Sequence, residues 1–212
     1  MRHGSQEQGE AVNQKVINGY EAAAERLIAP YEALPCERIY APVAGLFPAA
    51  PARVIDIGAG TGRDAAWLAS HGHCVTAVEP VAGFRAAGQR LHKGRDIRWI
   101  DDRLPDLAQV LSRKDSYDVL LLGGVWQHLS NAERKLAWGV LYRLMAPGAV
   151  TILSVRHGKG APGRPVYRAR DADIVVAARH LGLEVVRQTR AASIQPGNRA
   201  AGVTWTWFAL RR

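Results

Sequence analysis

The segment VIDIGAGTG, residues 54–62, joins a short apolar run to three closely spaced glycines. An apolar run of this length is typical of a buried strand. Glycines let the backbone turn sharply and approach a ligand where a Cβ would collide. In doubly wound α/β folds, the turn between the first strand and the next helix is a nucleotide-binding position. The segment therefore predicts a strand, a ligand-binding loop and the start of a helix.

Short apolar runs alternate with helical patterns along the chain after residue 54. Strands are expected at 54–57, 74–79, 97–100, 117–123, 149–155, 183–189 and 203–210, and helices at 63–71, 81–93, 104–112, 131–145 and 171–181. This alternation predicts βαβ units and a mostly parallel sheet with helices on both faces. No helix is expected between the last two strands, whose connection contains Pro196-Gly197-Asn198, so the sheet should end antiparallel.

The first 50 residues differ from the rest because no strand pattern separates their helical patterns. A helix is expected over 9–33, limited near its end by Pro30, and a shorter one over 36–47. A chain of 212 residues is expected to contain one domain. We therefore expect an N-terminal helical extension or lid at 1–50 and one globular unit at 51–212.

The composition is that of a globular protein, with 48% hydrophobic and 22% charged residues. Only two cysteines are present, Cys36 and Cys74, which excludes a disulfide framework and argues against a cysteine-based zinc site. No metal site is expected. No apolar run reaches about 18 residues, and the polar N-terminus lacks the apolar core of a secretory signal. Binding to a membrane is therefore not expected, and the cytoplasm is the expected location.

The formal net charge of +9 comes from the C-terminal part of the chain. Residues 134–212 contain 14 Lys and Arg but only 3 Asp and Glu. Arginine suits bidentate binding of carboxylate or phosphate, so this basicity fits an anionic substrate, a nucleic acid or simply a solvated surface. A loop rich in Gly, Pro and Arg, expected at 156–170, contains part of this charge.

Acidic residues stand at three strand ends near the glycines. Asp56 lies within the glycine motif, where a carboxylate would receive an ammonium or stabilise the loop. Glu79 ends the second expected strand, a position where an acid binds two ribose hydroxyls. Asp101-Asp102 follows the third expected strand, where a carboxylate can accept a hydrogen bond from an exocyclic amine. The alternative in this fold class, a nicotinamide dehydrogenase, requires G-x-G-x-x-G, but Arg63 occupies the last glycine position.

Three stretches resemble the class I S-adenosylmethionine-dependent methyltransferases. VIDIGAGTGRDAAWLASHGHCVTAVEP (54–80) is similar to the family's first two motifs, YDVLLLGGVWQHL (117–129) to its fourth-strand motif, and LYRLMAPGAVTILSV (141–155) to the helix and strand that follow. The resemblance covers about residues 50–156. It implies a Rossmann-like three-layer α/β/α sandwich, with a seven-stranded sheet of order 3-2-1-4-5-7-6 in which only strand 7 is antiparallel.

The resemblance also implies a site for S-adenosylmethionine, whose demethylated product is S-adenosylhomocysteine. The implied residues are Asp56, Gly58, Ala59, Gly60 and Gly62 around the methionine part, Glu79 with Pro80 at the ribose, Asp101 or Asp102 at the adenine amine with Arg103 and Leu104 flanking the base, and Gly123, Gly124 and Val125 at the sulfonium. Methyl transfer from a sulfonium is an in-line displacement, so much of the rate can come from placing the acceptor in line.

The methyl acceptor is expected at the carboxyl edge of the sheet, under the N-terminal helices. Residues expected to contact it are Tyr20, Tyr31, Trp126, Arg156 and Arg164. His128 and His157 are the candidate bases, and a base is required only if the acceptor keeps a proton until the transition state. The loop 156–170 is expected to close over the acceptor together with the N-terminal helix, with Arg156 or Arg164 binding an anionic group.

Methyl transfer to a small molecule is the favoured function. The position after the fourth strand reads Gly123-Gly124-Val125-Trp126 rather than the N/D-P-P-Y/F motif of amino-methylating enzymes, and no RNA-binding domain is appended. Two alternatives stay open. One is an RNA or other nucleic-acid methyltransferase that uses the basic C-terminal half, and the other is an accessory protein that binds the cofactor without turnover.

Overall fold

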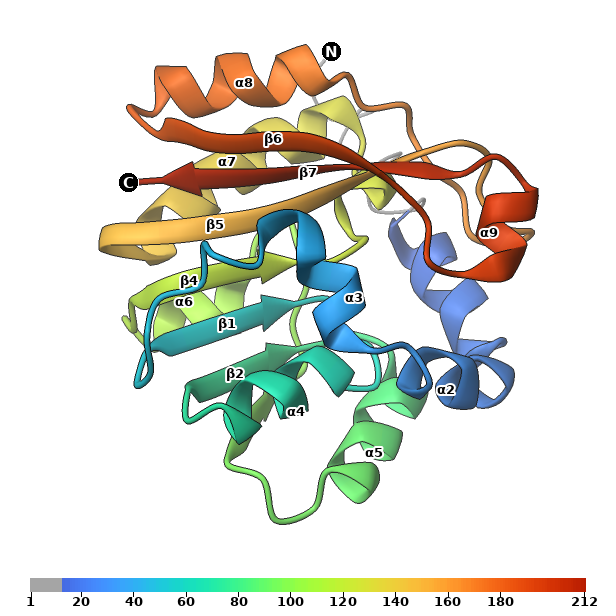
Figure 1. Ribbon diagram of the computed structural model, residues 1–212. Coiled ribbons are helices and arrows are strands. Elements are labelled where there is room, and N and C mark those ends of the chain that lie inside the picture. Colours follow the sequence, from blue (N-terminus) through green and yellow to red (C-terminus); the bar gives the residue numbers. More distant parts are fainter. Residues whose placement is uncertain (1–12) are drawn as a thin grey trace.

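The computed structural model describes residues 13–212, which are built around a seven-stranded sheet (Figure 1). The strands are β1 (Arg53–Ile57), β2 (Cys74–Val78), β3 (Ile97–Ile100), β4 (Tyr117–Leu122), β5 (Met145–His157), β6 (Glu184–Ala192) and β7 (Thr204–Arg211). Their order is β3-β2-β1-β4-β5-β7-β6. Strand β7 is antiparallel to β5 and β6, and the other pairs are parallel. The predicted strand order and the antiparallel last strand are confirmed.

Helices cover both faces of the sheet, because each face is apolar and must be removed from water (Figure 1). One face packs against α3 (Cys36–Tyr40), the 3₁₀ helix η1 (Ala41–Val43) and α4 (Arg63–Ser70), and the other against α6 (Ala108–Ser112), α7 (Asn131–Leu144) and α8 (Asp171–His180). The remaining helices are α2 (Ala24–Glu32), α5 (Ala82–Leu91), the 3₁₀ helix η2 (Trp126–His128) and α9 (Pro196–Ala200). Among residues 13–212, no helix is both long enough and apolar enough to cross a bilayer.

The predicted N-terminal helix is interrupted. Residues 13–21 are helical, and α2 begins after a turn at 22–23; the predicted helical residues 9–12 lie outside the described part of the chain. Both halves pack against α5 through one apolar cluster, to which the first half contributes Ile17 and Tyr20. The first half also reaches the loop after β3, where Asn13 donates a hydrogen bond to the carbonyl oxygen of Leu104 (2.9 Å). The turn lets one segment follow both walls of the site described below.

The second half of the N-terminal extension belongs to the main core. Tyr40 of α3 is 1% exposed and packs in the same apolar cluster as Val54 of β1 and Leu68 of α4. Its hydroxyl donates to the carboxylate of Asp64 (2.7 Å). The helices α3 and η1 are therefore a layer of the sandwich, whereas residues 13–35 of the extension lie outside that layer.

Three connections differ from the predicted pattern. Helix α6 begins at Ala108, four residues late, because buried Leu107 has a φ of +46° and cannot be helical. Strand β5 begins four residues early, because Met145 already pairs with Tyr117 of β4. The connection between β6 and β7 contains the short helix α9, which starts at Pro196, where a fixed φ suits the first helical position.

Gly88 allows α5 to approach the loop that follows β1. A Cβ at this position would overlap the ring of Trp99 and lie 2.6 Å from the carbonyl oxygen of Thr61 in that loop. Gly139 in the middle of α7 is a contrasting case, because a Cβ there would meet no atom within 4 Å. The two helical glycines therefore have opposite consequences for stability.

We expect Gly88→Ala to lower the free energy of unfolding by about 1–3 kcal/mol, the usual cost of overpacking. Gly139→Ala should raise it by about 0.5–1 kcal/mol, because alanine loses less backbone entropy in a helix. Urea unfolding followed by circular dichroism measures both. A change of the same sign in the two variants would contradict the tight approach at Gly88.

Candidate active site

A cavity of about 400 Å³ opens at the carboxyl edge of the sheet. One wall is formed by the loops after β1, β2, β3 and β4, and the other by residues 13–31, the loop after β5 and the connection between β6 and β7. This size is typical of small-molecule sites in proteins. The cavity brings the predicted loop motifs and the N-terminal helical segment into one site.

The loop after β1 is held against the end of β2. The backbone amides of Gly58 and Ala59 donate to the carbonyl oxygen of Val78, at 2.8 and 3.0 Å. Gly58, Gly60 and Gly62 have φ values of +76°, +57° and +78°. A Cβ on Gly58 would also overlap the side chain of Val125. Glycine is therefore required at Gly58 both for the turn and for the close approach.

Glu79 supports the same loop from the end of β2. One carboxylate oxygen accepts from the amide of Gly60 (2.7 Å) and the other from the amide of Val81 (2.8 Å). The side chain lines the cavity, although the residue is only 5% exposed. Burial raises the pKa of Glu79 to about 7, against the two backbone hydrogen bonds that lower it. Each oxygen has a second lone pair for a ligand hydroxyl.

Of the two adjacent acids after β3, Asp102 is the one at the cavity. Its carboxylate accepts from the amides of Arg103 (2.8 Å) and Val110 (3.0 Å), so its position is fixed by the turn before α6. Asp101 points elsewhere, with its side chain 60% exposed and paired with Arg85 at 2.7 Å. The sequence left these two acids open as alternatives, and only Asp102 lies against the cavity wall.

Asp56 lies beneath the loop rather than on the cavity wall, and is 2% exposed. Its Oδ2 has no hydrogen-bond partner among the described residues. Burial, and next the neighbouring Asp64, raise the pKa of Asp56 well above its ordinary value. Asp64 itself is paired with Arg63 at 2.7 Å and accepts from Tyr40. Asp56 is thus a buried acid with one unpaired oxygen next to the glycine loop.

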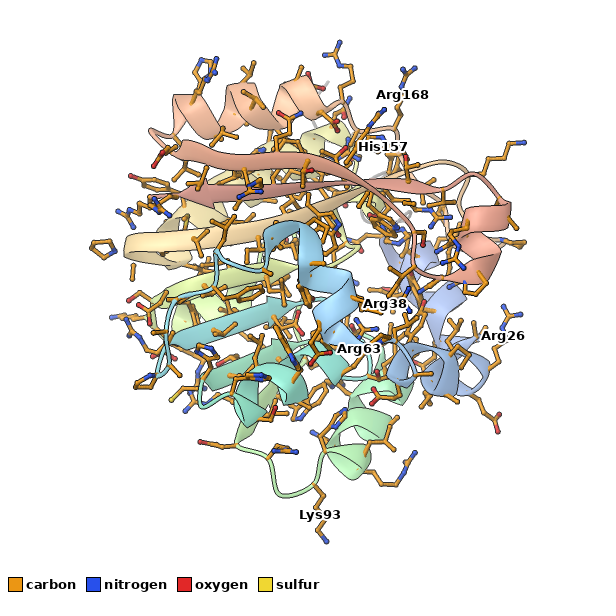
Figure 2. All side chains as sticks on the ribbon, in the orientation of Figure 1. Arg26, Arg38, Arg63, Lys93, His157 and Arg168 are labelled. Carbon is orange, nitrogen blue, oxygen red and sulfur yellow. The ribbon has the colours of Figure 1, made fainter. Side chains whose placement is uncertain are left out.

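The sequence analysis did not single out Arg63 or Asp64. Both line the cavity, as does Arg38 of α3, which Figure 2 shows with Arg63 where α3 meets α4. The Arg63 guanidinium also donates to the carbonyl oxygen of Tyr31 (2.9 Å), so it joins the glycine loop to the N-terminal segment. The signal in the sequence was the Arg-Asp pair directly after the last glycine of the motif.

Two guanidinium groups face the cavity at its other end. Arg164 lies 5.0 Å from the ring centre of Tyr20 and 3.4 Å from the hydroxyl of Tyr31. Arg156 donates to the side chain of Asn198 (3.2 Å) and to the carbonyl oxygen of Lys159 (2.9 Å). Within residues 13–212, neither guanidinium is in an ion pair with an acid.

His128 lies beside these arginines, with both ring nitrogens in contact. Its Nδ1 is 2.8 Å from the carbonyl oxygen of Pro165, and its Nε2 is 3.0 Å from the hydroxyl of Tyr20. A carbonyl oxygen can only accept, so Nδ1 has the proton and Nε2 accepts from Tyr20. Burial lowers the pKa of His128, and the nearby Arg164 and Arg156 lower it further. The imidazole is therefore neutral near pH 7.

Two predicted acceptor residues lie outside the cavity. Trp126 is 1% exposed and packs in the core against Trp138, with ring centres 4.9 Å apart, because η2 turns its side chain under the sheet edge. His157 lies at the end of β5 towards α8, where its Nε2 is 2.8 Å from the Thr206 hydroxyl and 3.3 Å from Asp171 (Figure 2). Neither side chain lines the cavity, so its geometry gives no support to an acceptor contact by Trp126 or to a base at His157.

Most of the other residues predicted for the site do line the cavity. The cavity is lined by Gly58, Ala59, Gly60, Glu79, Pro80, Asp102, Arg103, Leu104, Gly123, Gly124, Val125, Tyr20, Tyr31, His128, Arg156 and Arg164. Gly62 is not in its wall and instead forms the N-terminal end of α4. Trp205 and Asn198 also line the cavity, although neither was expected there. Asn198 was assigned to a plain loop, so nothing indicated that α9 would reach the site.

Comparison with protein families agrees with this architecture. Residues 54–148 match a family model described as a methyltransferase domain. No curated protein matches the sequence significantly.

Several solved structures share the fold. The 1,6-didemethyltoxoflavin N1-methyltransferase of Burkholderia thailandensis, solved with 1,6-didemethyltoxoflavin and S-adenosylhomocysteine, is 20% identical, with 96% of this chain and 90% of that one covered and a TM-score of 0.73. The magnesium protoporphyrin IX methyltransferase of Synechocystis, solved with S-adenosylmethionine, is 19% identical, with 94% of this chain and 83% of that one covered and a TM-score of 0.60. The N-methyltransferase NodS of Bradyrhizobium japonicum is 14% identical, with 84% of this chain and 95% of that one covered and a TM-score of 0.63.

These comparisons agree with the strand order and with the glycine loop. The matched segment contains the loop after β1 and Glu79, and it ends inside β5. Residues 54–148 are therefore a methyltransferase domain by the family match, and the strand order is the one expected for class I S-adenosylmethionine-dependent methyltransferases.

Proposed function

We propose that the protein transfers the methyl group of S-adenosylmethionine to a small molecule that has an anionic group. The observation that carries this proposal is a single cavity with two different ends. The residues of both ends line it, and the strand order places the glycine loop, Glu79 and Asp102, which follow β1, β2 and β3, on one side of β4, and Arg156 of β5 with Arg164 of the next loop on the other. A donor and an acceptor bound in one cavity can react as neighbours, which is the main requirement for this displacement.

The first end fits the cofactor. A Cβ on Gly60, which lines the cavity, would meet no protein atom within 4 Å, so there is open space for a ligand beside the loop, and the buried Asp56 carboxyl next to the loop has one oxygen without a partner among the described residues. Glu79 would bind the ribose hydroxyls and Asp102 the adenine amine. When bound, S-adenosylmethionine supplies a methyl group already activated by its sulfonium. The Burkholderia and Synechocystis methyltransferases, solved with product or cofactor, support the same assignment.

The second end favours an anionic acceptor. Arg156 and Arg164 face a shared space, and the acids in the cavity wall, Asp64, Glu79 and Asp102, belong to the first end. Desolvation lowers the pKa of Arg156, and the charge of Arg164 lowers it further, so the two cations are not neutralised by the protein. A carboxylate or phosphate on the acceptor would relieve this repulsion and accept charge-assisted hydrogen bonds.

A small acceptor is favoured over a nucleic acid because the cavity is covered. The residues before α3 and the loop after β5 meet above it, and a Cβ on Gly19 would overlap the carbonyl oxygen of Gly163. We propose that these two segments form the lid expected from the sequence. The Burkholderia and Synechocystis neighbours have names of small-molecule enzymes, which supports the same choice. His128, at the acceptor end, is the proposed base.

The overall proposal is tested by turnover. We expect radiolabelled methyl groups to pass from S-adenosylmethionine to a compound in an acidic small-molecule metabolite fraction, identified by mass spectrometry. Labelling only of RNA or DNA would establish the nucleic-acid alternative. Binding of S-adenosylhomocysteine without any labelling would establish a non-catalytic accessory protein.

We expect S-adenosylhomocysteine to bind the wild-type protein with a micromolar or lower dissociation constant, which corresponds to a binding free energy on the order of 8 kcal/mol. Glu79→Gln should weaken this binding by about 1–3 kcal/mol, because the side-chain amide has only one oxygen that accepts hydrogen bonds, whereas the carboxylate has two. Glu184→Gln is the matched control and should bind as the wild type does, since Glu184 is exposed at the start of β6, outside the cavity. Isothermal titration calorimetry measures all three, and equal affinities would remove Glu79 from the site.

The affinity should also depend on pH. In the free protein Glu79 has a pKa of about 7, with Arg85 and Asp101 as its charged neighbours. A ribose that needs the ionised carboxylate must displace its proton below that pH. Binding should therefore weaken as the pH falls from 7 towards 5, by up to about tenfold per unit, and level off above 7. Titrations of Glu79→Gln should lack this dependence, and a wild-type affinity that is flat from pH 5 to 8 would contradict it.

Arg164→Ala should raise the Michaelis constant of the acceptor found in the labelling screen by about 10- to 100-fold, the value of one charge-assisted contact. The affinity for S-adenosylhomocysteine should stay the same. Arg168→Ala is the matched control, because Arg168 comes from the same loop but is exposed outside the cavity (Figure 2). Equal effects of the two substitutions would mean that the basic loop acts only through its overall charge.

A further inference from the structure

The hydrogen bonds of His128 leave it no free nitrogen for the acceptor. Nδ1 donates to the Pro165 carbonyl oxygen, and the lone pair of Nε2 is used by the hydroxyl of Tyr20. The two rings meet edge to face, with centres 5.5 Å apart and an interplanar angle of 88°. A proton from the cavity can therefore reach Nε2 only through the oxygen of Tyr20.

Tyr20 is well placed for that role. Its side chain lines the cavity, and its ring is held between Phe84, at 6.0 Å between centres, and the guanidinium of Arg164. Its hydroxyl donates to His128 and so keeps lone pairs for an incoming donor. Burial raises the pKa of Tyr20, so the phenol keeps its proton at neutral pH. Tyr20 can then pass a proton on but cannot act as a phenolate.

We infer that Tyr20 is a catalytic residue that takes the proton of the acceptor and passes its own proton to His128, and that the acceptor nucleophile is a hydroxyl still protonated when it binds. This inference rests on the proposed function and deepens it. An amine that is already neutral, or a thiolate, would need no such relay. The pair thus specifies the chemical class of the nucleophile in addition to the anionic group bound by Arg164.

The step balances in atoms and charge. The acceptor oxygen forms a bond to the methyl carbon while the carbon–sulfur bond breaks and its electron pair stays on sulfur. The hydroxyl proton moves to the Tyr20 oxygen as the Tyr20 proton moves to Nε2 of His128. One positive charge is lost at sulfur and one appears on the imidazole, which later releases its proton to solvent. No oxidant, metal or further reactant is required.

Charged groups around the pair act in opposite directions. Arg164 and Arg156 face His128 and disfavour its charged form. Tyr31 and Glu79 disfavour ionisation of Tyr20, whereas Arg164 favours it. The anionic group of the acceptor, once bound between the arginines, would offset their effect on the imidazole. Substrate binding would therefore make His128 a stronger base than it is in the free protein.

The test uses two phenolic acids as probe acceptors with the full-length protein and S-adenosylmethionine. At about pH 8.5 the phenol of 3-hydroxybenzoate is protonated, as that of tyrosine is, whereas the ortho nitro group of 3-hydroxy-4-nitrobenzoate lowers the pKa of its phenol by about 3 units, so that this phenol is ionised. With the first probe, Tyr20→Phe should lower kcat by about 100-fold or more and leave the Michaelis constant within about threefold. With the second probe, the variant should keep most of the wild-type rate.

The control variant is Tyr167→Phe, which removes a phenolic hydroxyl from the loop after β5, outside the cavity, and should change neither rate. His128→Gln should reproduce the selective loss with the protonated phenol, because glutamine can still accept from Tyr20 but cannot take up a proton. It should also remove the acid limb of the kcat–pH profile, which we expect below the ordinary histidine pKa of about 6.5.

Two results would overturn the relay. One is an equal loss of rate for both probes in Tyr20→Phe, which would make Tyr20 a packing residue while the wild-type turnover upheld the proposed function. The other comes from ¹⁵N NMR of the wild-type complex with S-adenosylhomocysteine, which needs no acceptor. Protonation of His128 at Nε2 near pH 7 would contradict the relay even if neither probe were methylated, whereas a neutral ring protonated at Nδ1 supports it.

Discussion

The hydrogen bonds between the glycine loop and the end of β2 are the contacts on which the rest of the site depends. The amides of Gly58 and Ala59 are bound to Val78, and that of Gly60 to Glu79. These bonds turn the loop away from the sheet, so that its backbone rather than side chains faces the cavity. They also place Glu79 where it can bind the loop and a ligand together. A side chain at Gly58 would break this arrangement through Val125, which brings in the end of β4 as well.

The cavity also depends on contacts between segments distant in sequence. The N-terminal helical segment is bound to the loop after β5 by Arg164, which contacts Tyr20 and Tyr31, and by the backbone approach of Gly19 to Gly163. The same segment reaches α5 through Glu21, whose carboxylate accepts hydrogen bonds from the amide of Gly83. Both covering segments are thus tied to each other and to the sheet body.

The sequence predicted the parts of this protein that depend on local patterns. The sheet order followed from the family resemblance. The glycine loop and Glu79 could be predicted because each directly follows a short apolar run that marks a strand. Long-range packing decided the rest. Trp126 and Tyr20 were both aromatic candidates, but η2 buries the first against α7 while the broken N-terminal helix turns the second into the cavity. No local pattern contains that difference. The β6–β7 connection reached the site for the same reason, through a helix of five residues whose sequence reads as a loop.

If the proposed function is correct, the charges of the cavity would let one site hold both partners of the reaction and then release them. At the proposed cofactor end, Asp64 is paired with Arg63, and Glu79 and Asp102 are the acids left to face a cationic ligand, whereas the proposed acceptor end has two guanidiniums without an ion-pair partner among the described residues. An anionic acceptor bound between them lies next to positive charge on both sides, at the sulfonium and at Arg156 and Arg164. This attraction brings the nucleophile towards the methyl group. Transfer removes the sulfonium charge and leaves a cationic imidazole beside the two guanidiniums. The product state therefore has weaker attraction and stronger repulsion than the substrate state, which favours opening of the lid after the methyl group has moved.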